Sequence, residues 1–550
     1  MSSEAGSGVS GSANVAREVR RRRTFAIISH PDAGKSTMTE ALALHARMIS
    51  EAGAIHGKAG RKSTVSDWME MEKARGISVS STALQFSYTS EGHPVEGGAD
   101  DDVAYVINLV DTPGHADFSE DTYRVLTAVD AAVMLIDAAK GLEPQTLKLF
   151  QVCRHRGIPI ITVINKWDRP GQTPLELIDE ITERIGLVPT PLFVPVGIAG
   201  DFRGLLDRRT GDYVRFTRTA GGATIAPEEI LDAEAAAARE GDEWTAAVEE
   251  SELLAEMGQD HDQELFLAGQ TSPMIFASAM LNFGVRQLLE VLTELAPAPE
   301  ARNDIDGEPR EVGEPFSAVV FKVQAGMDTS HRDRLAYMRI VSGEFERGMV
   351  VTHAQTGKPF ATKYAQAVFG RDRSTVDRAY PGDVVGLVNA TALAPGDTLF
   401  DGPRVQFPPI PSFAPEHFSA LRATSAGKYK QFRKAMDQLD SEGVVQVLRN
   451  ETRGDASPVL AAVGPMQFEV VTARMKSEFG VDTVVEPLGY SLARRTDADS
   501  APELDRQRGV EVFTRTDGAL LALFSDRWRL QFIEKEHPDL TLEPLVATAE

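Results

Sequence analysis

Cysteine and long apolar runs are scarce in this sequence. Its 550 residues include one cysteine, Cys153, which cannot form an internal disulfide, and so low a thiol content fits a reducing compartment. No stretch approaches the roughly 18 continuous apolar residues of a membrane span. The first residues, Met1 to Gly8, are small and polar and lack the basic start and apolar core of a signal peptide. We therefore expect a cytoplasmic protein without a membrane partner.

Positive charge is also in short supply. The formal net charge is −24, which argues against an overall attraction to nucleic acid, and we expect no DNA partner. Acidic residues concentrate in residues 227–262, where Arg239 is the only arginine or lysine. Basic residues gather in residues 17–23 and 422–434. The second cluster has Tyr429 and Phe432 interleaved and fits either a contact with RNA or a solvated helix face.

The residue pattern divides the chain into several parts, and its length suffices for roughly three or four domains. Residues 1–20, rich in serine, glycine, alanine and then arginine, are predicted to be a disordered basic tail. Residues 21–300 alternate apolar strands with helices, as in a mostly parallel, doubly wound sheet, with a solvated helical insertion at about 200–270. Residues 312–402 have the short strands and glycine turns of a β-barrel, and residues 411–550 mix helices and strands as an α+β domain.

A phosphate-binding loop follows the first predicted strand, Thr24–Ser29. The strand runs into the sequence His30-Pro31-Asp32-Ala33-Gly34-Lys35-Ser36-Thr37, and a helix is expected from about Met38. In this context backbone N–H groups cradle phosphate oxygens, Lys35 reaches the outer phosphates and the Ser36 hydroxyl binds Mg²⁺. Ser29 stands where such loops usually have their first glycine. Ser29 to Thr37 are therefore predicted to bind the phosphates.

Three further segments, each after a predicted strand, complete a guanine-nucleotide site. Asp111 is placed to hold the Mg²⁺ shell through water, and Gly114 allows close backbone approach to the γ-phosphate. In the sequence Asn165-Lys166-Trp167-Asp168, the last carboxylate can accept two N–H groups that guanine has and adenine lacks, while the lysine stem packs against the base. The backbone of Ser278-Ala279-Met280 is expected to donate to the guanine oxygen. The four segments in this order predict binding of GTP and GDP and hydrolysis of GTP.

Two more residues are candidates for the hydrolysis step. Ser78, in the sequence Arg75-Gly-Ile-Ser-Val79, is the candidate second hydroxyl ligand of Mg²⁺ in a mobile switch, although an ordinary strand serine would look the same. His115 directly follows Gly114 and is predicted to orient the attacking water, although a lone histidine is often structural or exposed. No cation beyond Lys35 is evident for the developing charge, so we expect activation by a partner.

Together these motifs resemble the translational GTPases, which place a histidine after the Asp-x-x-Gly motif. Six stretches sharpen the resemblance: Phe25–Lys35, Ser66–Lys73, Asn282–Val285, His331–Arg334, Val445–Val447 and Gly464–Val470. The combination is similar to the bacterial class II peptide chain release factors, an elongation factor G-like branch of that family. The resemblance covers nearly the whole chain from about Arg23.

The resemblance implies an α/β P-loop GTPase domain followed by a β-barrel domain and an α+β domain. It implies a GTPase that acts on the ribosome in translation termination and removes class I release factors after peptide release. The implied partners are the factor-binding region of the ribosome and the class I release factors, and the implied cofactors are GTP, GDP and Mg²⁺. We expect a monomer whose GTP hydrolysis the ribosome stimulates.

Three alternatives remain open from the sequence. An elongation-type translocase resembles longer relatives with two more domains, for which 550 residues leave no room. A ribosome-protection GTPase that uses GTP as a conformational clamp would share the same nucleotide motifs, so the last domain has to distinguish it. A P-loop ATPase is disfavoured by Asp168, because adenine lacks the two donors that this carboxylate can accept.

Overall fold

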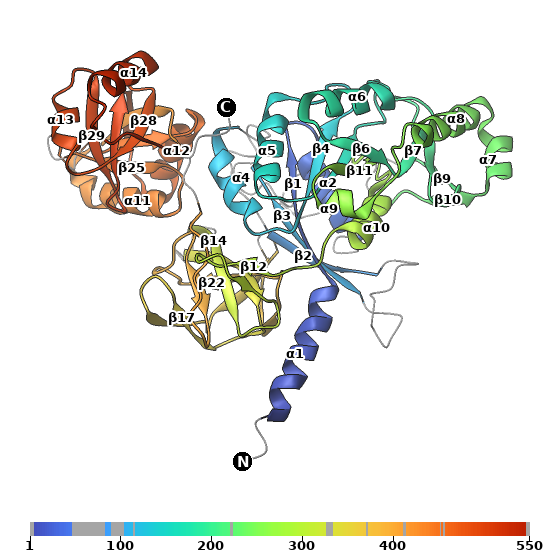
Figure 1. Ribbon diagram of the computed structural model, residues 1–550, viewed down its shortest axis with the longest axis horizontal. Helices are drawn as coiled ribbons and strands as arrows, with labels where there is room; N and C mark the ends of the chain where they lie inside the picture. The colour runs from blue at the N-terminus through green and yellow to red at the C-terminus, as the bar shows by residue number, and fades with distance from the viewer. Residues whose placement is uncertain are drawn as a thin grey trace.

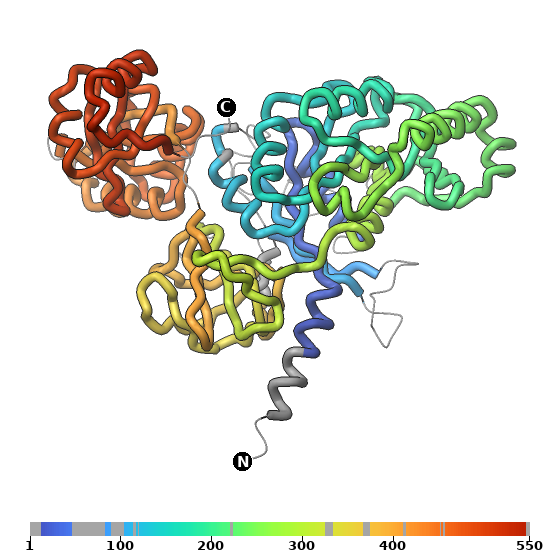
Figure 2. Tube along the Cα trace, in the orientation of Figure 1, coloured from blue at the N-terminus to red at the C-terminus, as the bar shows by residue number. Residues whose placement is uncertain are grey.

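The computed structural model describes residues 5–46, 83–89, 104–113, 116–219, 224–325, 334–369, 372–410, 414–450, 453–454 and 457–545. Three units follow one another along this chain (Figures 1 and 2). The first, coloured blue to green, contains the nucleotide motifs, the second is yellow, and the third runs from orange to red. Among the helices of the described ranges, none has the length and apolar character needed to cross a bilayer.

A seven-stranded sheet forms the centre of the first unit, with strand order β2-β3-β1-β4-β5-β11-β6. The edge strand β2 is antiparallel to β3 and the other pairs are parallel, so the predicted mostly parallel sheet is confirmed. The strands are β1 (Arg22–Ser29), β2 (Ala83–Tyr88), β3 (Tyr105–Asp111), β4 (Ala131–Asp137), β5 (Ile160–Asn165), β6 (Val188–Pro191) and β11 (Thr271–Phe276). The helices of this unit are α2 (Lys35–His45), α4 (Ser119–Leu126), α5 (Pro144–His155), α6 (Pro174–Ile185) and α10 (Val285–Leu295), with the short 3₁₀ helix η1 (Ala116–Phe118) before α4.

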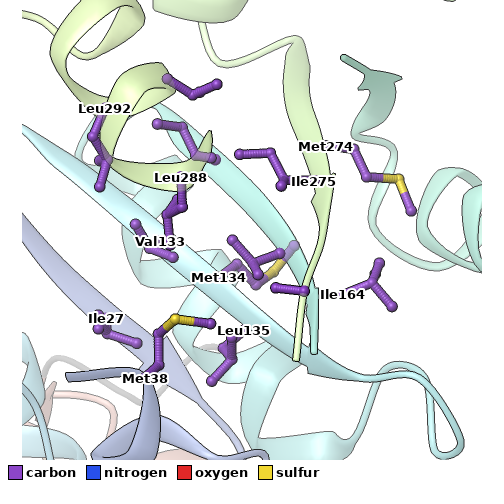
Figure 3. Close-up of a cluster of buried hydrophobic side chains, with 14 of the residues drawn as sticks. Ile27, Met38, Val133, Met134, Leu135, Ile164, Met274, Ile275, Leu288 and Leu292 are labelled. Atoms are coloured by element: carbon purple, nitrogen blue, oxygen red, sulfur yellow. The ribbon is translucent and has the colours of Figure 1, made fainter. Parts of the chain in front are cut away.

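The core of this unit fixes the start of helix α2. Val133, Met134 and Leu135 of β4 belong to one buried cluster with side chains of β5, β11 and helix α10 (Figure 3). At one end of this cluster Met38 of α2 lies beside Ile27 of β1, and both side chains are fully buried (Figure 3). Burying a side chain of this size stabilises by about 1.5–3 kcal/mol. The first turn of α2 is therefore held against the sheet, and the loop before it has a fixed end.

The segment between β6 and β11 contains more than the predicted helices. Four short strands form an antiparallel sheet of order β10-β9-β8-β7, and three helices follow it. These elements are β7 (Phe193–Val196), β8 (Gly204–Asp207), β9 (Tyr213–Phe216), β10 (Glu228–Leu231), α7 (Ala233–Glu240), α8 (Asp242–Glu256) and α9 (Gln263–Leu267). Trp244 of α8 packs against Tyr213 of β9, with ring centroids 5.5 Å apart. Strands of four residues carry too little alternation to be recognised from sequence.

The prediction of a disordered tail is wrong for residues 5–20, which form helix α1 (Ala5–Arg20). Glu18 accepts hydrogen bonds from Arg21 and Arg22, at 2.9 and 2.6 Å. Val15 and Val19 pack against Tyr380 of the second unit, whose hydroxyl accepts a hydrogen bond of 3.1 Å from Asn14. The partner that stabilises the end of this helix therefore lies 366 residues from Asn14 in sequence, out of reach of a local pattern.

The second unit is an eight-stranded antiparallel sheet of order β18-β17-β23-β14-β15-β22-β19-β20, the β-barrel-like architecture predicted. Two short two-stranded sheets, β12–β13 and β16–β21, accompany it. The strands are β12 (Arg302–Asn303), β13 (Pro309–Arg310), β14 (Ser317–Ala325), β15 (Arg334–Ser342), β16 (Phe345–Glu346), β17 (Val350–His353), β18 (Lys358–Ala361), β19 (Ala365–Phe369), β20 (Asp372–Thr375), β21 (Arg378–Ala379), β22 (Val384–Val388) and β23 (Thr398–Phe400). Arg339 of β15 binds both oxygens of Asp130, at 2.7 and 2.8 Å, which ties this unit to the first.

The third unit combines an eight-stranded sheet of order β27-β24-β26-β25-β29-β30-β28-β31 with four helices and a short 3₁₀ helix. Its helices are η3 (Ala426–Lys428), α11 (Tyr429–Ser441), α12 (Met466–Phe479), α13 (Ala501–Asp505) and α14 (Arg527–Glu536). Its strands are β24 (His417–Ala423), β25 (Gln446–Arg449), β26 (Val459–Ala462), β27 (Thr483–Pro487), β28 (Leu492–Thr496), β29 (Val510–Arg515), β30 (Leu520–Phe524) and β31 (Glu543–Pro544). The mixture agrees with the predicted α+β class.

The third unit contacts the first at the start of helix α12, on the side where α4 lies (Figure 1). The Met466 N–H donates to the Asp117 carboxylate at 2.6 Å, and Phe118 packs against Val470. Gly464 leaves room for this contact: a Cβ at that position would lie 2.1 Å from Cγ of Asp117. This contact is formed two residues after His115, so the third unit touches the segment next to the predicted catalytic residue.

Candidate nucleotide-binding site

The predicted phosphate loop lies between β1 and α2. Strand β1 ends at the buried Ser29, and α2 begins at Lys35, three residues before the predicted start. Within the loop the Ala33 N–H donates to the His30 carbonyl at 3.3 Å, and Asp32 has a positive φ of 68°. Pro31 and Asp32 lie toward the surface, whereas Ala33 is buried. Ser36 and Thr37 lie in the first turn of α2. A hydroxyl that binds the metal next to the phosphates has to come from this turn.

Gly34 is required at its position for two independent reasons. Its φ of 98° lies in the left-handed region, where side chains with a Cβ are strained. A Cβ there would also lie 2.4 Å from Nδ2 of Asn165. That amide donates to the Ala33 carbonyl at 2.8 Å, so the base-recognition segment and the phosphate loop are in direct contact. The two loops can approach each other because Gly34 has no side chain.

Lys35 and Asp111 form the charged part of the site. The Lys35 ammonium lies 3.2 Å from Oδ1 of Asp111, and both side chains are buried. Both residues lie at the carboxyl ends of neighbouring strands: Lys35 begins α2, which follows β1, and Asp111 is the last residue of β3. A buried cation beside a buried carboxylate, with the Ser36 hydroxyl in the same helix turn, is the donor set that a phosphate with a bound divalent ion needs. These residues fit a nucleotide with Mg²⁺.

The base-recognition residues meet at the carboxyl ends of β5 and β11. Asn165 accepts the Ala279 N–H at 3.0 Å through Oδ1, which holds the loop 278–280 next to the end of β5. The Ser278 hydroxyl donates to Oδ1 of Asp168 at 2.5 Å and so orients the carboxylate. Met280, the last residue of this loop, is 51% exposed. The segments predicted from sequence to recognise guanine are therefore brought together.

Lys166 makes contacts that the sequence did not indicate. It has a positive φ of 65°, and its ammonium donates to the Asp32 carbonyl and, at 2.7 Å, to Oδ2 of Asp137. Burial acts to raise the pKa of Asp137, but hydrogen bonds from Lys166 and the Ala139 N–H outweigh burial and hold that pKa below its usual value. Asp137 was not among the predicted site residues. Its place at the carboxyl end of β4, between β1 and β5, is the signal that would have found it.

Three predicted residues, Ser78, Gly114 and His115, lie outside the described residues. Their roles in Mg²⁺ binding, in the approach to the γ-phosphate and in orienting the attacking water stay predictions. The described residues nearest to the last two in sequence are Pro113, at the end of a buried stretch, and Ala116, which begins η1.

The basic cluster at residues 422–434 is less suited to base stacking than its sequence indicated. Phe432 is 1% exposed and belongs to the core of the third unit, so that only Tyr429 of the two aromatic residues is exposed. Arg422 pairs with Glu486 at 2.8 Å, and Lys428 donates to the Gly480 carbonyl. Lys430, Arg433 and Lys434 remain on the exposed face of α11. The cluster therefore offers charge more than stacking surface.

Three family models match successive parts of the chain. Residues 20–298 match the elongation factor Tu GTP-binding domain, which covers the nucleotide site described above. Residues 315–402 match domain 2 of elongation factor G. Residues 407–534 match the C-terminal domain of the class II release factor RF3.

Curated relatives match the chain over nearly its whole length. A peptide chain release factor 3 from Microcystis aeruginosa is 45% identical over 532 residues, covering 96% of this chain and 95% of the relative. Another from Gloeothece citriformis is 46% identical, covering 95% of each chain. A crystal structure of a protein from Thermus thermophilus has a TM-score of 0.66 at 22% identity and covers 86% of this chain and 68% of its own. The solved structure supports the fold alone.

Proposed function

The chain belongs to the peptide chain release factor 3 family, and from this membership we propose that it acts on the ribosome in translation termination, promoting the departure of class I release factors after peptide release. It is a GTPase, as its nucleotide-binding domain indicates. The observation that carries the proposal is the extent of the similarity: it includes the C-terminal unit, which separates release factors from other translational GTPases.

The proposed chemistry assigns a role to each part of the site. Bound GTP with Mg²⁺ supplies the scissile phosphate bond and the positive charge that offsets its developing negative charge. Lys35 would direct its ammonium to the outer phosphates, and the metal would be held by the Ser36 hydroxyl and, through water, by Asp111. Asp168, oriented by Ser278, accepts the two N–H groups of guanine.

His115 is proposed to orient the attacking water, and Ser78 to bind Mg²⁺ in the GTP-bound state. The Met466 N–H contacts the Asp117 carboxylate two residues after His115, and we propose that docking on a partner positions His115 through this link to the third unit. The ribosome is the proposed partner, so turnover without it is slow. The protein is proposed to act as a monomer in the cytoplasm.

The exposed cations Lys430, Arg433 and Lys434 are proposed to contact ribosomal RNA through phosphate charges, since the buried Phe432 is not free to stack on a base. Such a contact weakens steeply with salt concentration. A triple substitution of these residues to glutamine is expected to weaken ribosome binding at low salt and to leave GDP affinity unchanged. Unchanged ribosome binding would assign α11 to a solvated face.

A single assay tests the proposed function. Post-release ribosomes that carry a labelled class I factor are mixed with this protein and GTP, and the departure of the label is followed over time. Faster departure with GTP than with GDP supports the proposal, whereas no acceleration would refute the release-factor role. An elongation-type or ribosome-protection GTPase would hydrolyse GTP on these ribosomes without changing the departure of the factor.

His115→Ala serves as the matched variant in this assay. GTP affinity is expected to stay near the wild-type value, while ribosome-stimulated hydrolysis falls by about 10²- to 10⁴-fold, the usual contribution of a positioned proton-handling side chain. GTP turnover is measured with and without ribosomes. Full stimulated turnover in this variant would remove His115 from the catalytic site.

A further inference from the structure

The loop after β4 contacts both halves of the nucleotide site. At its start, Asp137 binds the ammonium of Lys166 at 2.7 Å, on the base-recognition side. At its end, Glu143 lies 3.2 Å from Nε2 of His30, on the phosphate-loop side. Strand β4 lies between β1 and β5 in the sheet, so residues 137–143 are placed between the two loops that bind phosphate and base.

We propose that Asp137 is a positioning residue for nucleotide binding: it holds the Lys166 ammonium against the phosphate loop and thereby slows nucleotide dissociation. The proposal deepens the nucleotide site described above and rests on guanine-nucleotide binding there, not on the ribosomal role. Asp137 acts through Lys166, whose stem is the part that packs against the base.

The geometry of Asp137 leaves little freedom to its carboxylate. One oxygen accepts the Ala139 N–H at 2.9 Å and the other accepts the Lys166 ammonium, and the side chain is 7% exposed. The Gly141 N–H donates to the Asp137 carbonyl at 2.9 Å, which closes the turn after β4. The carboxylate is therefore fixed by its own loop before it meets Lys166.

Lys166 needs such an anchor. A lysine side chain has four rotatable bonds and is costly to order. Here its ammonium donates both to the Asp32 carbonyl and to Asp137, so the side chain reaches from the base-recognition segment to the phosphate loop. Its backbone is held separately, because Trp167 donates its N–H to the Ala277 carbonyl at 3.1 Å. With the carboxylate removed, one neutral carbonyl remains to hold the charged end.

The expected effect follows from the loss of one charge-assisted hydrogen bond. Asp137→Asn keeps the shape of the side chain and an oxygen for the Ala139 N–H, and removes the charge that faces Lys166. Hydrogen bonds to charged groups correspond to about a 10- to 100-fold change in an equilibrium. We therefore expect labelled GDP to dissociate about 10- to 100-fold faster from this variant.

A double-mutant cycle separates this role from a merely structural one. Dissociation of fluorescently labelled GDP is measured by chase with unlabelled GDP for wild type, Asp137→Asn, Lys166→Met and the double variant. If Asp137 acts through Lys166, its substitution has an effect in the wild-type background and none in the Lys166→Met background. Equal effects in both backgrounds would overturn the proposal, as would a rate within about twofold of wild type in Asp137→Asn.

Asp207→Asn is the matched control. Asp207 accepts the backbone N–H of Arg209 at 2.9 Å and the guanidinium of the same residue at 2.8 Å. As at Asp137, the carboxylate binds the N–H two residues on and a cationic side chain. Asp207 lies at the end of β8, however, in the small antiparallel sheet and not in the nucleotide site. Its substitution is expected to leave GDP dissociation unchanged. The preference for GDP over xanthosine diphosphate (XDP) should stay the same in Asp137→Asn, since Asp168 is intact. If the wild-type protein bound no GDP, the nucleotide site itself would be refuted. This result is distinguishable from a failure of the proposal for Asp137.

Discussion

Gly464→Ala is the substitution that probes how the third unit docks on the first. A methyl group at this position would lie 2.1 Å from Cγ and 2.6 Å from Cβ of Asp117. Because Cβ is itself too close, a rotation of the Asp117 side chain cannot relieve the overlap, and the two backbones have to separate. The hydrogen bond from the Met466 N–H to the carboxylate, 2.6 Å long, is then lost.

The size of the effect has two parts. The lost hydrogen bond to a charged acceptor is worth about 1.5–3 kcal/mol. Forcing extra volume into a packed contact costs a further 1–3 kcal/mol or so, and here the packing of Phe118 against Val470 suffers. Part of this cost disappears when the units move apart, so we expect a loss of about 2–4 kcal/mol in docking free energy. The folding of each unit should be little affected.

Hydrogen exchange followed by mass spectrometry measures this loss at its origin. The amides at the start of α12 are expected to exchange at least about tenfold faster in Gly464→Ala, because each 1.4 kcal/mol corresponds to a factor of ten. Gly489→Ala is the control, since Gly489 lies in the same unit and its Cβ would meet nothing within 4 Å. Unchanged protection at Met466 in Gly464→Ala would refute the reasoning from this contact.

Three further predictions concern the first unit. Gly34→Ala is expected to weaken GDP binding by at least about tenfold, because a Cβ costs about 1–2 kcal/mol in the left-handed region and would also meet Asn165. Titration with labelled GDP measures this affinity, and a wild-type value would contradict the prediction. Asp168→Asn is expected to shift preference from guanine to xanthine nucleotides, which competition between GDP and XDP measures; an unchanged preference would contradict the base assignment. His45→Gln is expected to flatten the pH dependence of stability. Burial, with the positive charge of Arg286, lowers the pKa of His45 to about 4 from 6.5. Between these values the unfolded chain binds the proton and the folded one does not, so the native state loses up to about 3 kcal/mol as pH falls from 6.5 to 4. The melting temperature, measured at several pH values over this range, should fall less steeply with decreasing pH for the variant than for wild type. Equal slopes would refute the prediction.

The segments of the nucleotide site could be proposed from the sequence because each one is a short run of neighbouring residues. Each predicted segment follows a strand of the parallel sheet, and the carboxyl ends of such strands meet at one edge. Asn165, Asp168 and Ser278 are therefore close together once the strand order is formed, and their hydrogen bonds follow. The apolar runs also predicted the buried strands, since a strand covered on both faces has no polar side.

Other features depended on partners far away in the chain. Residues 5–20 lack the composition of a stable helix, but Tyr380 and the neighbouring arginines hold its end in place. The sheet β7–β10 consists of strands too short to show a period. Phe432 lies among basic residues in sequence, yet it faces the core, because a helix places neighbours on different sides.

The sequence by itself determined that this protein binds guanine nucleotide and hydrolyses GTP, because the identity and order of a few side chains specify that chemistry. Its similarity over nearly the full length determined the family. Only the tertiary structure decided which groups support those side chains. The contact of Asp137 with Lys166 joins the end of β4 to the residue that follows β5, and that of Asp117 with Met466 joins residues of two units that are 349 positions apart in sequence. Such contacts leave no local pattern, since either partner alone is an ordinary polar or apolar residue until folding brings the other to it.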